Sequence, residues 1–156
     1  MKNILDETRM LASSTCNHYL EEAKKQGRKI IGYFCSYMPE EMIHAAGMIP
    51  YRMRAVENDG TKRADAYYSS INCTFVRLCF NKALAGDFEF LDGVVFVNGC
   101  DHSRRMYDNW RYAGIAPPFL HMFFSPHTIN TTALDYFALE CSKLKSSIEK
   151  HFQVSI

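Results

Sequence analysis

The sequence predicts an α/β fold in which a doubly wound, mainly parallel sheet of about four strands has helices on both faces, as in Rossmann and flavodoxin-like proteins. Short apolar runs alternate with longer segments whose apolar residues recur at helical spacing, the order typical of a parallel sheet covered by helices. The run at 91–97 is nearly all apolar, as in a strand buried on both faces. We expect residues 1–156 to form a single α/β domain, with an N-terminal helix at about 5–26 and a core at about 29–152.

The first part of the chain predicts a helix, then two strands joined by a short helix. Residues 5–26 carry apolar side chains at helical spacing and stop at Gly27, a residue that favours helix ends. The apolar run at 29–34 predicts a buried strand. Pro39 suits the first turn of a short helix that ends at Gly47, and residues 48–54 predict the second strand.

The second part of the chain alternates in the same way. Residues 55–66 are polar and charged, which indicates a long loop. The elements predicted after it are a helix at about 72–85, a strand at 91–97, a helix at about 102–112, a strand at 119–124 and an amphipathic helix at 131–152.

Composition and missing motifs exclude several classes of protein. A formal net charge of +1 favours neither a nucleic-acid partner nor an anionic membrane surface, and no run of 18 apolar residues is present to span a membrane. The N-terminus turns polar and acidic too early for a signal peptide, so we expect a cytoplasmic protein. Neither a GxGxxG motif after the first strand nor a Walker loop occurs, which argues against a nucleotide site of the phosphate-cradling kind.

Cysteines are the most informative residues. There are six without any CxxC pair, which argues against a zinc ribbon or a disulfide framework. Cys35, Cys73 and Cys100 each follow a predicted strand or precede a predicted helix, so they could share the sheet edge where such folds bind ligands. A helix N-terminus favours the thiolate, and thiolates hold iron–sulfur clusters. The alternative for each cysteine is burial as a small apolar side chain, which we expect of Cys16, Cys79 and Cys141.

Three segments resemble the 2-hydroxyacyl-CoA dehydratases and the related benzoyl-CoA reductases. Residues 32–50 read GYFCSYMPEEMIHAAGMIP and resemble the first strand–helix–strand unit of that family. Two further segments resemble the cluster-cysteine motifs of the family. The first motif is resembled by CTFVR at 73–77, and the second by the stretch from LDGVV at 91–95 to CDHSRRMYDNW at 100–110. The resemblance runs from about residue 29 to 152, with the motifs in the family order.

The resemblance implies an iron–sulfur subunit, or an N-terminal fragment of one, that eliminates water from (R)-2-hydroxyacyl-CoA. Such enzymes hold an oxygen-sensitive 4Fe-4S cluster, receive one electron from an ATP-dependent activator protein and expel the hydroxyl group from a ketyl radical. A homologous second subunit would complete a heterodimer. The alternatives are a benzoyl-CoA reductase-type subunit, a double-cubane cluster reductase, or a metal-free remnant without activity.

Individual residues carry over by position. Cys73 and Cys100 correspond to cluster ligands, and the third ligand of the family lies in a second domain, beyond the segment that this chain resembles. Cys35 is the best local candidate for a third ligand, the alternative being that it packs under Tyr33 and Tyr37. Ser36 corresponds to a catalytic hydroxyl that reaches the thioester carbonyl, the alternative being that it caps the helix near Pro39.

The helix after Cys100 carries charged residues of less specific meaning. We expect Asp101 to cap this helix. Arg104 and Arg105 could attract the phosphates of CoA, the alternative being an ordinary exposed arginine pair.

Overall fold

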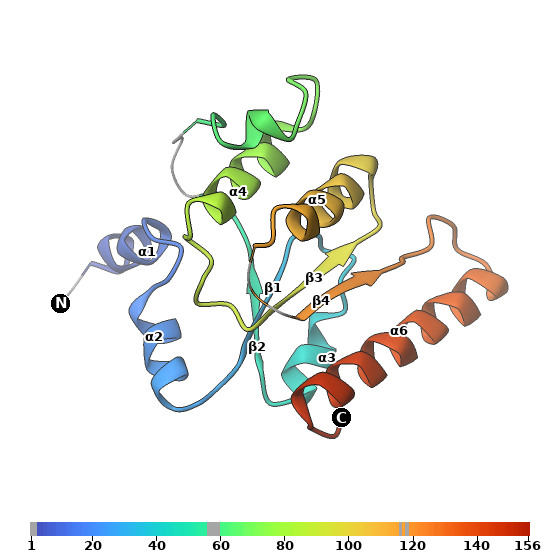
Figure 1. The fold of residues 1–156 in the computed structure, drawn as a ribbon. Helices are drawn as coiled ribbons and strands as arrows, with labels where there is room; N and C mark the ends of the chain where they lie inside the picture. Colours follow the sequence, from blue (N-terminus) through green and yellow to red (C-terminus); the bar gives the residue numbers. More distant parts are fainter. Residues whose placement is uncertain (1–2, 56–59, 116, 118) are drawn as a thin grey trace.

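Four parallel strands form one sheet, and helices cover both of its faces (Figure 1). The structure is a computed structural model that describes residues 3–55, 60–115, 117 and 119–156. The strands are β1 (Ile30–Tyr33), β2 (Ile49–Arg52), β3 (Gly93–Val97) and β4 (Phe119–Phe123), in the spatial order β2-β1-β3-β4. This arrangement confirms the predicted α/β fold with a doubly wound parallel sheet.

The helices divide between the two faces of the sheet. They are α1 (Ile4–Ala12), α2 (His18–Lys25), α3 (Glu40–Ala45), the short 3-10 helix η1 (Ala64–Ala66), α4 (Thr74–Leu84), α5 (Asp101–Tyr112) and α6 (Thr131–Phe152). Apolar residues of α4 and α5 pack on one face, and those of α3 and α6 pack on the other (Figure 1). In the described part of the chain, no helix has the length and apolar character needed to cross a membrane.

The single N-terminal helix predicted at about 5–26 is wrong, because two helices occupy this segment. α1 ends at Ala12, and α2 begins after Asn17, whose side chain accepts hydrogen bonds from the backbone N–H groups of Tyr19 and Leu20. An asparagine cap of this kind stabilises a new helix start. The loop predicted at 55–66 contains η1, and its residues 56–59 lie outside the described part of the structure.

The core consists of two apolar layers, one on each face of the sheet. On the α4/α5 face, the rings of Phe34, Phe96 and Trp110 contact one another, with the Phe96 centroid 5.5 Å from that of Phe34 and 5.6 Å from that of Trp110. On the other face, fully buried Leu144 and Ile148 of α6 pack against the sheet. All residues of β3 are buried, which confirms the expectation for the apolar run there.

The strand order places a topological switch point between β1 and β3. The chain leaves β1 through α3 toward β2 on one side of the sheet and returns through α4 to β3 on the other side. Ligands of open α/β sheets bind outside the carboxyl ends of the strands at such a point. Cys35 follows β1 and Cys100 follows β3, so the chain places thiols at this crevice.

Replacing Gly93 with alanine tests the close packing beside β4. An added Cβ would lie 2.6 Å from Cδ1 of Phe119 and 3.0 Å from Cδ1 of Ile31, so we expect Gly93→Ala to lower the free energy of unfolding by about 1–3 kcal/mol. Urea unfolding followed by circular dichroism measures this change. Gly99→Ala is the matched control, because its Cβ would meet no atom closer than 3.5 Å. Equal stability of both variants would contradict the packing argument.

Candidate functional site

Two exposed cysteines occupy equivalent positions on neighbouring helices. Cys73 is the N-cap residue of α4 and Cys100 is the N-cap residue of α5. The two helices pack against each other on one face of the sheet (Figure 1). Each thiol therefore stands where the helix dipole favours negative charge. The structure places both cysteines at helix starts, as the sequence predicted.

The turn that carries Cys100 is fixed by a serine of α5. The Ser103 backbone N–H donates to the Cys100 Sγ over 3.4 Å, so the thiol itself caps the helix. The buried Ser103 hydroxyl donates to the carbonyl oxygen of Val97 over 2.7 Å and holds the helix start on the end of β3. The expectation that Asp101 caps α5 is wrong, because Asp101 is the first helical residue and pairs with Arg104.

A side-chain contact joins the two cysteine turns. The Asn72 Oδ1 and the His102 Nδ1 are 3.1 Å apart, and the Asn72 amide also donates to the carbonyl oxygen of Ser69 over 3.1 Å. Asn72 directly precedes Cys73, and His102 lies two residues after Cys100. The contact therefore holds the starts of α4 and α5 beside each other.

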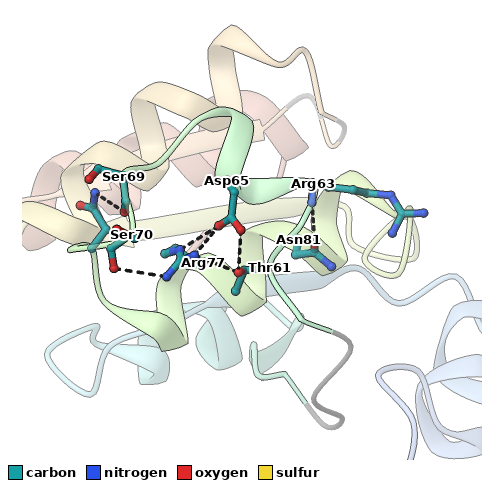
Figure 2. Close-up of polar contacts among 8 residues, drawn as sticks. Thr61, Arg63, Asp65, Ser69, Ser70, Arg77 and Asn81 are labelled. Carbon is teal, nitrogen blue, oxygen red and sulfur yellow. Dashed lines mark hydrogen bonds and ion pairs between the residues drawn. The ribbon is translucent and has the colours of Figure 1, made fainter.

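A second set of contacts fixes the segment before Cys73 (Figure 2). Arg77 donates from Nε to Asp65 over 3.0 Å, from Nη2 to the Thr61 hydroxyl over 2.9 Å, and from Nη1 to the carbonyl oxygen of Ser70 over 3.4 Å. Its guanidinium also forms an ion pair with Asp65, and the hydrogen bond from Arg77 lowers the pKa of that carboxyl group. Arg77 was not among the predicted site residues, although its place one helical turn after Cys73 within the motif was the available signal.

Cys35 lies at the same crevice but is less exposed than Cys73 and Cys100. It is half-buried and packs with the apolar residues on the α3/α6 face, which include Tyr33. Its Sγ would lie 3.5 Å from a Cβ built on Gly99, so the thiol neighbours the residue before Cys100. Within residues 3–55, 60–115, 117 and 119–156, no three His, Cys, Asp or Glu side chains gather into a group that could hold a metal ion. The assignment of Cys35 as a cluster ligand stays a prediction.

Ser36 lies in a small polar pocket beside β1 and β2. The pocket has a volume of about 160 Å³, and Tyr33, Glu40 and Arg52 also line it. The Tyr33 hydroxyl donates to the Glu40 carboxylate, and burial together with Glu40 raises the pKa of Tyr33 to about 12. No side-chain hydrogen bond caps α3 among the described residues, so the alternative that Ser36 is a helix cap is wrong. The catalytic role of Ser36 stays a prediction.

A larger depression of about 430 Å³ opens beside the two cysteine turns. It is lined by Asn72, Asp101, His102, Arg104, Arg105 and Asp108. Both arginines are exposed and already have carboxylate partners on α5, since Arg104 pairs with Asp101 and Arg105 lies 3.7 Å from Asp108. These pairs offset much of the charge that would attract a phosphate. A role of the arginines in binding CoA stays a prediction.

Comparison with known proteins identifies the family. The family model of the 2-hydroxyglutaryl-CoA dehydratase D-component matches residues 35–156. The chain is 34% identical over 94 residues to the beta subunit of (R)-2-hydroxyglutaryl-CoA dehydratase from Acidaminococcus fermentans, an alignment that covers 60% of this chain and 25% of that protein.

Two further relatives extend the similarity along the chain. A subunit of benzoyl-CoA reductase from Thauera aromatica is 30% identical over 125 residues, which cover 78% of this chain and 32% of that relative. The beta subunit of lactoyl-CoA dehydratase from Anaerotignum propionicum is 23% identical over 154 residues, 98% of this chain and 40% of that relative. The chain thus spans well under half the length of these relatives, and each of them is a subunit.

Thiol labelling tests which cysteines the fold presents. In the folded chain we expect a maleimide to modify Cys73 and Cys100 first, because both are exposed. Cys79 should react last, because its side chain is fully buried and burial raises its pKa to about 12. Mass spectrometry of peptides after timed labelling gives the order, and labelling in urea shows that each thiol can react. Modification of Cys79 as fast as Cys100 in the folded chain would contradict this placement.

Proposed function

The chain belongs to the 2-hydroxyglutaryl-CoA dehydratase D-component family, and we propose that it acts as an iron–sulfur subunit, or as part of one, in an enzyme that eliminates water from (R)-2-hydroxyacyl-CoA. The observation that carries the proposal is the pair of exposed cysteines, Cys73 and Cys100, that occupy the N-cap positions of two neighbouring helices. A homologous second subunit and an ATP-dependent activator protein would work with it in the cytoplasm.

The donor set fits part of a 4Fe-4S cluster. Cys73 and Cys100 would each ligate one iron through a thiolate, the ligand type that such clusters use. The Ser103 backbone N–H, which already donates to the Cys100 Sγ, would remain as a hydrogen-bond donor to a ligating sulfur. These two thiols are not a complete ligand set. A further ligand would come from Cys35 after a local rearrangement or from protein outside residues 1–156.

The residues of this chain would bind and polarise the substrate. The chemistry that the cluster supplies when bound is the transfer of single electrons to the acyl-CoA thioester. Ser36 would donate a hydrogen bond to the thioester carbonyl oxygen and stabilise the negative charge that develops on it. The Tyr33 hydroxyl in the same pocket already donates to Glu40, which makes Ser36 the hydroxyl that we assign to the substrate.

Benzoyl-CoA reduction is the second candidate function. It is favoured by the 30% identity to the T. aromatica benzoyl-CoA reductase subunit, whose alignment covers more of this chain than that of the A. fermentans dehydratase subunit. Both candidates need a cluster at the same cysteines. They differ in the product, a 2-enoyl-CoA in one case and a ring-reduced thioester in the other, which mass spectrometry of the CoA esters distinguishes.

Cysteine substitution tests the ligand assignment. After anaerobic reconstitution with iron and sulfide, we expect Cys73→Ala and Cys100→Ala to abolish cluster binding, because each removes a ligand. Cys141→Ala should retain the wild-type amount, because Cys141 is half-buried on α6. Iron and acid-labile sulfide are counted per chain, and EPR of the reduced samples identifies the cluster.

Two outcomes would contradict the proposal. Equal iron retention in all three variants would show that Cys73 and Cys100 are not ligands. A wild-type chain that binds no iron, alone or with a homologous dehydratase subunit, would favour the metal-free alternative.

A further inference from the structure

Arg77 connects three points of the chain that surround the start of α4. Thr61 precedes η1, Asp65 belongs to η1, and Ser70 lies three residues before Cys73. Figure 2 shows the guanidinium between these groups, with Asp65 and Thr61 on one side and Ser70 on the other. The side chain of Arg77 is only 13% exposed, so these contacts replace most of its hydration.

The guanidinium group suits this position better than other cations would. It presents its N–H donors in a planar fork and thereby serves a carboxylate, a hydroxyl and a carbonyl group at once. Asp65 is itself held, because the Thr61 hydroxyl donates to its second oxygen over 3.0 Å. Connected contacts of this kind restrain geometry more strongly than an isolated surface pair.

The contacts of Arg77 enclose the turn that carries Cys73. Arg77 lies one helical turn after Cys73, and the carbonyl group of Ser70 lies before it, so the bond between them spans the cysteine. Asn72 restrains the same turn from the other side through Ser69 and His102. No side-chain hydrogen bond holds Cys73 as a helix cap, in contrast to Cys100, so its orientation depends on the backbone of this turn.

We propose that Arg77 is a positioning residue for the Cys73 thiol and sets its separation from Cys100. This inference rests on the proposed function, in which the two thiols ligate one cluster. Residues that orient metal ligands commonly change metal affinity about 10–100-fold when they are replaced. Arg77 would act through the backbone, without touching the cluster or the substrate.

Asn81 provides a matched control on the next turn of α4. Its side-chain oxygen accepts a hydrogen bond from the Arg63 backbone N–H over 2.9 Å, and the side chain is 3% exposed. Asn81 thus anchors the same segment around η1 without reaching the turn of Cys73 (Figure 2). Replacing a residue that only docks this segment should leave the separation of the Cys73 and Cys100 thiols unchanged, as we expect for Asn81. Replacing a positioning residue should alter that separation.

The test measures the separation of the two thiols without iron. Nitroxide labels are attached to Cys73 and Cys100 in the full chain, with Cys16, Cys35 and Cys141 replaced by serine and buried Cys79 retained. EPR line broadening then reports the distance between the labels and its spread. We expect one defined separation in this background and in Asn81→Ala, and loss of that defined separation in Arg77→Met, with partial recovery in Arg77→Lys.

Thermal unfolding separates positioning from stability. Arg77→Met that still unfolds cooperatively but has lost the defined separation supports the proposal, and unchanged EPR spectra in Arg77→Met overturn it. If Arg77→Met does not fold, Asp65→Asn decides in the same way, since it removes the ion pair but leaves Arg77 a polar partner. Loss of the defined separation in Asn81→Ala, to the same extent as in Arg77→Met, would also overturn the proposal.

Iron retention keeps this inference distinct from the proposed function. If the wild-type chain binds a cluster, Arg77→Met should bind it about tenfold more weakly. A wild-type chain that binds no iron would remove the proposed function, whereas the label separation in the iron-free chain would still decide whether Arg77 positions Cys73.

Discussion

The pairing of β1 with β3 is the constraint on which the rest of the molecule depends. The two strands run parallel at the centre of the sheet, with Ile31 opposite Gly93 and Tyr33 opposite Val95, and all residues of both are buried. This pairing makes the carboxyl ends of the strands neighbours and creates the switch point. Cys35 and Gly99, far apart in the sequence, meet there, and Cys100 follows directly.

Two kinds of residue occupy the N-cap positions of the longer helices. α1, α2 and α6 begin at the asparagines Asn3, Asn17 and Asn130, whose side chains accept backbone N–H bonds. The N-cap residues of α4 and α5 are cysteines instead, and of these two only Cys100 makes a cap hydrogen bond. A poor cap costs a helix about 0.5–2 kcal/mol. Contacts of Arg77, Asn72 and Ser103 fix the two helix starts through other groups.

Local patterns predicted most elements but not the contacts between them. The central strands and α4 to α6 were predicted from apolar periodicity. A helix or strand that buries one face or both faces carries apolar residues at a matching spacing in the sequence. The break at residues 13–17 was missed because the apolar spacing continues across it while the cap at Asn17 starts a new helix. The expectation for Asp101 failed because carboxylates favour the cap position in general, whereas here the preceding thiol fills it.

The sequence by itself determined the fold class, the family resemblance and the placement of Cys73 and Cys100 at helix starts, because periodicity and motif order are properties of neighbouring residues. Only the tertiary structure decided that Cys35 packs beside the core of the α3/α6 face, that Asn72 meets His102, and that Arg77 joins Asp65 to Ser70. Asn72 and His102 alone are 30 positions apart in the sequence. Such pairings depend on how the crossovers wind around the sheet, and no local pattern encodes that path.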